Sequence, residues 1–511
     1  MAALEIGLFV LALPFVVTYA LQHYTTAWAN TSLLLSFQLV CVYLTGIFTS
    51  TLVYRAFFHP LRQFPGPTGA KLSKFWTLWK VYKADQRWYL QVPELHKKYG
   101  DYVRTGPREL TIGDPNALPH VLGFQSKAFK GSWYDSMEES ISTTRDRVFH
   151  KQRRKVYDSA IKQLLTTYTP TLEGVTSQLL ERIARDEDKP ILVNTMTHDY
   201  SYDILTQLVF GEPQGFVTGL IDQKALQIFS SIDEAVAAIG YVYNAPWIMS
   251  VLTRIGRIAG PMKIFNDWSH KTLQKRKETG MKKPDLIEEI IANTSTDAFG
   301  QSVLHAEART LIGAGSDTTA TCMAEILIIL ANHPEYVQKL REELDPLLRS
   351  GDFFCQATYP ILDSIINETL RMYPTVLFPS ARETPAEGIQ IGDVYIPPFT
   401  GISMNVWHVH HDPRNFAYPD DFIPERWTTK PELVLNRAAF IPFTIGPANC
   451  PGKPLAMMEL RSTISRIIHQ YDVSFPEGAK FNEREFFAKI KDYFVAFCPR
   501  QELVFSRRML H

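Results

Sequence analysis

Residues 441–456 read IPFTIGPANCPGKPLA and place one thiol, Cys450, among glycines and prolines. This stretch cannot be a regular helix or a central strand, because proline lacks an N–H donor and fixes φ. A buried structural cysteine would not explain so restricted a backbone. A metal-binding thiolate does, because glycines let backbone N–H groups turn toward the sulfur and a helix beginning near Lys453 or Pro454 directs its positive end there.

Other interpretations of the loop are weaker. It resembles a P-loop, but five residues separate Gly446 from Gly452, and Pro454 occupies the position of the Mg-binding hydroxyl. The five cysteines of the chain are scattered and form no C-x-x-C pair, which argues against a disulfide scaffold, a zinc site and an oxidising compartment. One thiolate without companion ligands suits heme rather than zinc or an iron–sulfur cluster.

The composition is that of a large, neutral chain. The 511 residues include 53 basic and 53 acidic side chains, so the net charge does not favour a nucleic-acid partner. Length alone suggests about three domains. No low-complexity linker or repeat divides the chain, so a single large domain is also possible.

The amino end is predicted to be a membrane anchor, residues 1–56. The clearest span is 32–54, which has no charged residue and the length needed to cross a bilayer. Basic residues follow this span, which predicts that the rest of the chain faces the cytoplasm. An earlier uncharged run, 6–21, is a second span or an interfacial helix; a cleaved signal peptide is disfavoured because no Lys or Arg precedes it. Asn30 lies in a glycosylation sequon that would sit in the turn between two spans.

A Pro-rich connector, 57–70, leads to the soluble part, 71–511. Its prolines are expected to oppose both helix and sheet. Beyond it, helical spacing covers residues 302–331, 334–348, 361–373 and 453–471. Short strands are expected within 102–114, 388–397 and 493–508. The predicted fold is mainly α with small β-sheets.

Polar groups interrupt the long apolar helix at Asp317 and Thr318. An unpaired buried carboxylate is costly, so Asp317 needs a partner or a function. Thr318 can donate to the carbonyl of Ala314 and bend the helix, and Gly313 and Gly315 leave space for a ligand. This is a place for a small polar reactant and a proton path, although a solvent-facing stripe would give the same pattern.

Glu368 and Arg371 share one helical face, an arrangement that is usually a weak surface pair. Arg426, in the coil segment FIPERW, could join them in a buried network. On another predicted helix His150 and Arg154 lie four residues apart, with Lys151, Arg153 and Lys155 nearby. That helix is either a basic surface, a grip on an anionic group, or a docking face for an acidic protein.

Taken together, these motifs resemble the cytochrome P-450 superfamily of heme-thiolate monooxygenases. The family's F-x-x-G-x-R-x-C-x-G loop is matched by Phe443, Gly446, Cys450 and Gly452, and its oxygen-activating helix by Ala314, Gly315, Asp317, Thr318 and Thr319. Its E-x-x-R pair and the associated arginine are matched by Glu368, Arg371 and Arg426. The similarity covers the chain from about Pro60 to its carboxyl end. Within the superfamily, the chain most resembles fungal microsomal enzymes of secondary metabolism.

The loop departs from the family pattern at one position. Ala448 stands where the family has an arginine that holds a heme propionate. The resemblance therefore implies that His150, Arg154 and Arg382 take over this role. It also implies Cys450 as the axial ligand of heme b (iron protoporphyrin IX), Thr318 beside bound dioxygen and Asp317 as a proton relay.

The implied activity is insertion of one oxygen atom of O2 into a lipophilic small molecule, a fungal alkaloid, terpenoid or polyketide. Electrons would come from NADPH–cytochrome P-450 reductase, docked on Lys151, Arg153, Lys155 and Lys453, with cytochrome b5 as an optional second donor. The enzyme would lie in the endoplasmic reticulum membrane, facing the cytoplasm, and Gly240–Leu252 would also touch the bilayer. A pocket near Val376, Leu377, Phe378, Ala308 and Ile312 would hold the substrate. Two alternatives are a peroxide-rearranging heme-thiolate isomerase and a non-catalytic membrane-anchored binding protein.

Overall fold

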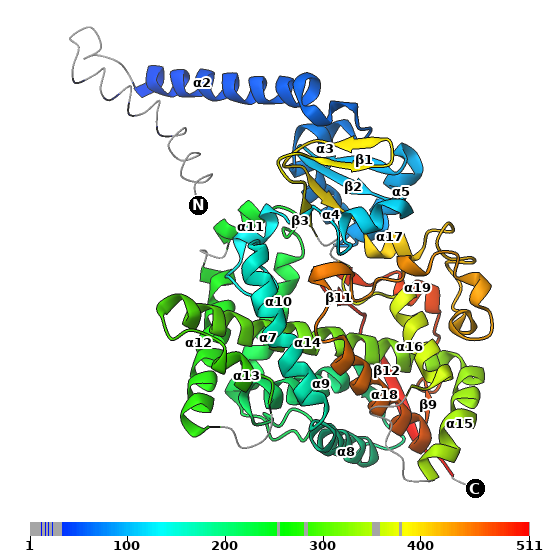
Figure 1. Cartoon of the computed structure of the whole chain (residues 1–511). Coiled ribbons are helices and arrows are strands. Elements are labelled where there is room, and N and C mark those ends of the chain that lie inside the picture. The colour runs from blue at the N-terminus through cyan, green and yellow to red at the C-terminus, as the bar shows by residue number, and fades with distance from the viewer. Residues whose placement is uncertain are drawn as a thin grey trace.

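The computed structural model describes residues 33–252, 256–280, 285–349, 358–377 and 381–509, together with the single positions 12, 16, 19 and 23. The apolar run 6–21, apart from positions 12, 16 and 19, and the sequon at Asn30 lie outside these residues, as does Phe378 of the predicted pocket. Figure 1 shows a helical body beside a small sheet, with one helix, α2 (Leu33–Val53), projecting from the sheet end.

The projecting helix is the predicted anchor. It continues through a π-helical turn, η2 (Tyr54–Phe58), and the stretch Phe37–Phe58 is long and apolar enough to cross a membrane. Almost none of this stretch packs against the rest of the protein. The long helix α14 (Ala298–Asn332) is also long and apolar enough, but it is mostly buried as a core element.

The connector after the anchor contains short helical turns, contrary to the expectation that its prolines would oppose helix. The 3₁₀ turn η3 (Pro60–Gln63) begins at Pro60, and α3 (Thr68–Leu72) follows Pro67. Proline is tolerated in a first turn because that N–H has no intrahelical partner. Leu61 and Phe64 are buried, so the connector is fixed to the body.

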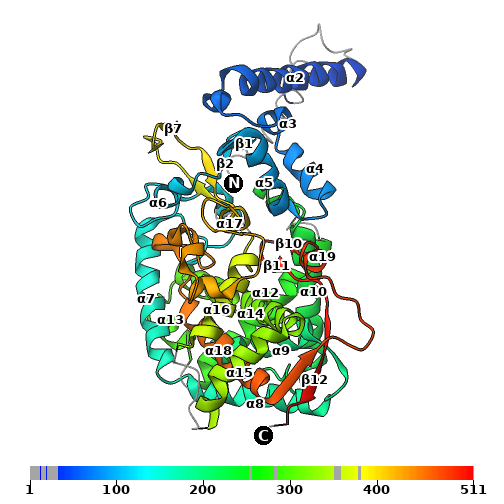
Figure 2. The same cartoon turned by 90° about the vertical axis from the view of Figure 1, so that its right-hand side faces the viewer.

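Helices make up most of the protein, as predicted, and α14 runs through the middle of the helical body (Figure 2). The predicted helices within 302–331, 334–348, 361–373 and 453–471 correspond to α14, α15, α16 and α18. The helices not yet given bounds are α4 (Phe75–Lys83), α5 (Trp88–Tyr99), α6 (Leu118–Val121), α7 (Arg147–Leu165), α8 (Thr169–Arg185), α9 (Val193–Phe210), α10 (Gln223–Ile239), α11 (Pro246–Leu252), α12 (Gly256–Thr279), α13 (Ile287–Ala292), α15 (Pro334–Arg349), α16 (Pro360–Met372), α17 (Val406–His410), α18 (Lys453–Gln470) and α19 (Glu483–Phe487). Further 3₁₀ turns are η4 (Pro115–Ala117), η5 (Ser132–Ser136), η6 (Pro424–Trp427), η7 (Pro431–Leu433), η8 (Arg437–Ala439) and η9 (Gly446–Ala448).

The sheets are small. The largest has the strand order β1-β2-β8-β5-β3, in which β2 and β8 are parallel and the other pairs antiparallel. A three-stranded sheet, β4-β12-β9, and two hairpins complete the set. The strands are β1 (Tyr102–Gly106), β2 (Glu109–Ile112), β3 (Phe129–Lys130), β4 (Pro190–Leu192), β5 (Arg382–Glu383), β6 (Ile389–Ile391), β7 (Val394–Ile396), β8 (Gly401–Ser403), β9 (Tyr471–Ser474), β10 (Lys491–Asp492), β11 (Ala496–Phe497) and β12 (Glu502–Arg507).

Two hydrophobic clusters form most of the interior. The larger lies between the body helices and includes the second half of α14, whose residues from Cys322 to Leu330 are almost completely buried. The smaller lies between the five-stranded sheet, the hairpin β6–β7 and the segment before α18. Phe443 packs against the larger cluster and Ile445 against the smaller one, so the segment that leads to Cys450 runs between the two clusters.

Candidate active site

The Cys450 loop is shaped by backbone contacts that only glycine permits at one position. Gly446 has φ +74°, and a Cβ there would lie 2.0 Å from the carbonyl oxygen of Leu122. Directly beyond the turn η9, the N–H of Cys450 donates to the carbonyl of Phe443 at 3.0 Å. Gly446 thus allows the loop to pack closely against the residues that follow helix α6.

Cys450 lies at the amino end of α18. Its side chain is exposed, yet desolvation by the surrounding protein atoms raises the pKa of the thiol. Hydrogen bonds from the backbone N–H groups of Gly452 and Lys453, and the positive charges of Arg154 and Lys453, act in the opposite direction and favour the thiolate. A sulfur with these donors is suited to bind a soft metal centre.

Arg154 holds this loop from α7. Its Nη1 donates to the carbonyl oxygen of Asn449 at 2.7 Å and to the side-chain oxygen of the same residue, and its Nε donates to Asp158 at 2.7 Å. In the structure Arg154 therefore positions the residue next to Cys450. Its predicted contact with a propionate stays a prediction.

Two buried cationic side chains and a buried histidine gather beside α7. Lys130 and Arg382 face each other across the β3–β5 ladder, and His150 of α7 lies close to both. Burial and then the charge of Arg382 lower the pKa of Lys130 to about 7, while burial followed by the charges of Lys130, Arg154 and Arg382 lowers the pKa of His150 to about 4. Such mutual repulsion indicates a site that an anionic group would stabilise.

Lys130 is a member of this cluster that the sequence reasoning missed. Its Nζ donates to the carbonyl of Ile141 at 2.6 Å. The only signal in the sequence is a lysine in the segment KAFKGSW, which has no helical partner to draw attention to it. The cations come from a loop strand, a helix and a distant strand, and only the tertiary structure brings them together.

Asp317 and Thr318 lie in the middle of α14, which runs unbroken through this segment. The Thr318 hydroxyl donates to the carbonyl of Ala314 at 2.8 Å, as expected. Burial raises the pKa of Asp317, and its Oδ1 accepts a hydrogen bond from the Tyr202 hydroxyl at 3.1 Å. A Cβ at Gly313 would meet no atom within 4 Å, whereas one at Gly315 would lie 2.7 Å from Leu205. Gly313 thus leaves space, while Gly315 serves the close approach of another helix.

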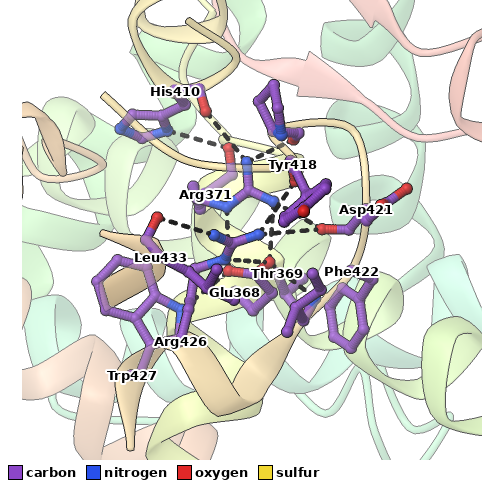
Figure 3. Close-up of polar contacts among 12 residues, drawn as sticks. Glu368, Thr369, Arg371, His410, Tyr418, Asp421, Phe422, Arg426, Trp427 and Leu433 are labelled. Carbon is purple, nitrogen blue, oxygen red and sulfur yellow. Dashed lines mark hydrogen bonds and ion pairs between the residues drawn. The ribbon is translucent and has the colours of Figure 1, made fainter. Parts of the chain in front are cut away.

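Glu368, Arg371 and Arg426 form one buried network, shown in Figure 3. Glu368 accepts hydrogen bonds from Arg371 Nε at 3.0 Å and Nη2 at 2.8 Å, and from Arg426 Nε at 2.9 Å. All three side chains are completely buried, so the surface-pair interpretation does not apply to them. The arginines also donate to carbonyl groups of the segment 410–433. The network therefore fixes the meander that precedes the Cys450 loop.

The prediction that Arg153 belongs to the docking face is wrong. Arg153 is buried, donates to both carboxylate oxygens of Glu307 and to the carbonyl of Asn293, and is not available to a partner protein. It points inward because helix α7 presents positions 150, 153, 157 and 160 to the core. The three exposed lysines of that prediction are Lys151, Lys155 and Lys453.

The predicted pocket residues are mostly interior. Leu377, Ala308 and Ile312 are buried in the larger core cluster, and Val376 packs against the cluster around Trp133 and Tyr243. Trp133 donates to the carbonyl of Tyr243 at 2.6 Å and stacks on Phe494 with ring centroids 5.5 Å apart. This aromatic cluster joins the turn η5 to the loop before α11.

The fold and sequence together define the class of protein. Residues 65–495 match the family described as Cytochrome P450, and the chain belongs to that family. It is a P450 monooxygenase, and the family implies a heme-thiolate cofactor and an electron-donating partner.

Individual relatives cover nearly the whole chain. The cytochrome P450 monooxygenase orf5 of Eupenicillium brefeldianum is 36% identical over 482 residues, which are 92% of this chain and 96% of that protein. The tryprostatin B 6-hydroxylase of Aspergillus fumigatus is 34% identical over 453 residues, covering 86% and 80% of the two chains. A zebra fish cytochrome P450 solved with progesterone shares the fold, with a TM-score of 0.69 and 20% identity over 82% of this chain and 99% of that one.

Proposed function

We propose that this chain is a membrane-anchored monooxygenase in which Cys450 is the axial ligand of heme b. The observation that carries the proposal is the Cys450 thiol at the amino end of α18, with two backbone N–H donors, together with a group of buried basic side chains on β3, α7 and β5. A thiolate ligand and two propionates are the parts of a heme-thiolate group that such donors would hold. Lys130, His150 and Arg382 would bind the propionates, with Arg154 securing the loop that carries Cys450.

When bound, the heme supplies activation of O2 with electrons from NADPH, and the thiolate favours cleavage of the O–O bond. The chain's own contribution is the placement of protons and substrate. The Thr318 hydroxyl holds a proton at the distal side, and Asp317 relays protons to it. Desolvation raises the pKa of the Asp317 carboxyl, which makes it a better proton acceptor and suits a relay that must both accept and release a proton.

The substrate class follows from the relatives and the interior. The similar fungal enzymes include a tryprostatin B 6-hydroxylase. Val376 and the aromatic cluster around Trp133 provide an apolar wall. We infer that the substrate is a fungal secondary metabolite, hydroxylated at a carbon atom, with an alkaloid, terpenoid or polyketide skeleton.

The division of the chain is proposed as residues 1–56 for the anchor, 57–70 for the connector and 71–511 for the catalytic domain. The exposed aromatic side chains beside the anchor support contact with the bilayer: Phe75 packs edge-on against Trp247 with ring centroids 5.8 Å apart, and both are exposed. The stretch Gly240–Leu252 therefore lies beside helix α4. This arrangement suits a protein of the endoplasmic reticulum whose catalytic domain faces the cytoplasm.

The electron donor is proposed to be NADPH–cytochrome P-450 reductase, with cytochrome b5 as an optional second donor. Lys151, Lys155 and Lys453 are exposed on α7 and α18, the helices that hold the Cys450 loop. Cationic side chains at that place would steer an acidic partner toward the cofactor. Arg153, which is buried, is excluded from this surface.

The decisive test is the spectrum of the reduced protein with carbon monoxide. Only a heme-thiolate gives the red-shifted band, so the wild type should show it and Cys450→Ala should lose it. A Cys450→Ala protein with the normal band would disprove the ligand assignment, and a wild type without bound heme would favour the binding-protein alternative. The isomerase alternative is separated by turnover: it would convert a peroxide substrate without O2 or reductase, whereas the acid–Thr pair favours monooxygenation.

A further inference from the structure

Helix α9 lies directly against α14 at the level of Asp317. The closest point is Gly315, where any Cβ would collide with the side chain of Leu205, and one residue further along Ser316 donates to the carbonyl of Ser201 at 3.5 Å. Both serines are fully buried. Within the pattern A-G-x-D-T, Gly315 thus allows α9 to pack closely against α14. The close packing lets a side chain of α9 reach the carboxyl group of Asp317.

Tyr202 is the α9 residue that reaches it. Its hydroxyl donates to Asp317 Oδ1 at 3.1 Å. Its ring packs against Phe216 and Phe229, with centroids 5.2 Å and 4.7 Å away, and these two rings also contact each other at 4.9 Å. These aromatic contacts restrict the Tyr202 ring and thereby the position of the hydroxyl that donates to Asp317.

One turn before Tyr202 lies His198, a half-buried histidine whose ring centroid is 6.1 Å from that of Tyr202. Its Nδ1 lies 2.8 Å from the carbonyl oxygen of Asn194, so Nδ1 carries the proton and Nε2 is the second site for protonation. The positive charge of His198 is, after burial, the largest influence on Asp317, and it acts to lower the pKa of that carboxyl.

The other carboxylates of this part of α9 are already bound. Asp199 pairs with Arg182 at 2.7 Å, and Asp203 accepts hydrogen bonds from the backbone N–H groups of Gln214, Gly215 and Val217. Within the described residues, neither carboxylate accepts a hydrogen bond from the Tyr202 hydroxyl, which donates to Asp317. His198, Tyr202 and Asp317 therefore line up from the half-exposed face of α9 to the polar segment of α14.

We propose that His198 and Tyr202 form the outer part of the proton path that ends at Asp317. The imidazolium of His198 gives a proton to the Tyr202 oxygen, directly or through one water, while the Tyr202 hydroxyl passes its own proton to the Asp317 carboxylate. His198 becomes neutral and is reprotonated by solvent, so one proton moves inward and no group is oxidised or reduced. This inference rests on the proposed role of Asp317 as the relay to Thr318.

The test compares Tyr202→Phe, which keeps the ring and removes the hydroxyl, with Tyr200→Phe on the same helix. Tyr200→Phe is the matched control because it also removes a tyrosine hydroxyl from a buried hydrogen-bond network. That network contains Thr176 and Thr463 and does not include Asp317. Hydrogen peroxide released per NADPH oxidised should rise several-fold in Tyr202→Phe and in His198→Gln, and product formation should fall by about tenfold, the effect of losing one hydrogen bond to a charged group. Tyr200→Phe should leave both quantities near wild type.

A second measurement follows the carboxyl group of Asp317 by infrared spectroscopy and does not depend on turnover. The infrared carboxyl band that disappears in Asp317→Asn should shift in Tyr202→Phe and not in Tyr200→Phe. If Tyr202→Phe and His198→Gln match Tyr200→Phe in coupling and in this band while Asp317→Asn is uncoupled, the inference is overturned and the role of Asp317 stands. If Asp317→Asn is itself fully coupled, the proposed relay fails and the outer path with it. Should Tyr202→Phe not fold, His198→Gln and its infrared band decide the question.

Discussion

Replacing Glu368 by glutamine tests whether the buried network holds the Cys450 loop in place. Glutamine keeps the shape of the side chain and removes its charge. Five donors converge on the carboxylate: besides the three arginine contacts, the indole N–H of Trp427 donates at 2.9 Å and the backbone N–H of Ile423 at 2.9 Å. An amide offers only one acceptor oxygen, so some of these donors must lose their partner.

The size of the effect follows from how the donors divide. Three of them, from Arg371 Nη2, Arg426 and Ile423, reach Oε1, while Arg371 Nε and Trp427 reach Oε2. Glutamine therefore satisfies at best three and turns its NH₂ group toward two other donors. One of the two lost bonds joins charged partners, worth about 1.5–3 kcal/mol, and the substitution removes the carboxylate with which both buried arginines pair. Breaking a buried ion pair typically costs about 3–5 kcal/mol, which is the loss we expect.

The assay is urea unfolding of the heme-loaded protein, followed by far-ultraviolet circular dichroism and by heme absorbance. The matched control is Glu425→Gln in the same meander, because Glu425 pairs with Lys339 at the surface and such pairs contribute about 0–1 kcal/mol. Glu368→Gln should unfold at clearly lower urea and release heme before the helices unfold. Equal urea midpoints for Glu368→Gln and Glu425→Gln would refute the reasoning. If the charge of the side chain matters more than its length, Glu368→Asp should have a midpoint between those of Glu368→Gln and wild type.

Three further predictions address the cofactor site, the membrane and pH. Arg382→Ala should release heme about tenfold to a hundredfold faster, because a charge-assisted hydrogen bond is worth about 1.5–3 kcal/mol, and adding Ala448→Arg should recover part of the loss; unchanged release would end the compensation argument. Carbonate should leave the full-length protein in membranes, and a form lacking residues 1–55 should be released only in part because Phe75 and Trp247 remain exposed; complete extraction of the intact chain would exclude the anchor. Burial lowers the pKa of His408 to about 4, so unfolded chains bind its proton first, and stability that is full above about pH 6.5 should decline toward pH 4 by up to ~3 kcal/mol. His408→Gln should flatten that decline in urea unfolding measured at several pH values.

Many features could be predicted from the sequence because they depend on residues close together in it. The Cys450 loop is one, since its glycines and prolines restrict the backbone locally and the helix that follows begins within a few residues. The apolar span that ends near Val53 is another, because length and the lack of charge are visible without a fold. The long helix and its Asp317–Thr318 interruption, and the helices 334–348 and 361–373, follow from spacing alone.

Other features depend on segments far apart, and no local pattern marks them. The sequence could suggest that Arg426 joins Glu368 and Arg371, but the packing of the meander decides that the three meet and that all are completely buried. Arg153 looked like a surface cation because its neighbours are basic, while its side chain points to Glu307, 154 positions away. Charge in a short window cannot tell which face of a helix is covered.

The same physical reason separates the site itself into two parts. The sequence by itself was enough to predict Cys450 as the metal-binding thiol and Asp317–Thr318 as the acid–Thr pair, since each motif is defined by a few adjacent residues. Only the tertiary structure decided that Lys130 lies opposite Arg382 and that Tyr202 reaches Asp317. These pairs are set by strand register and by the close packing of α9 on α14, and both depend on long-range contacts that form only when the chain folds.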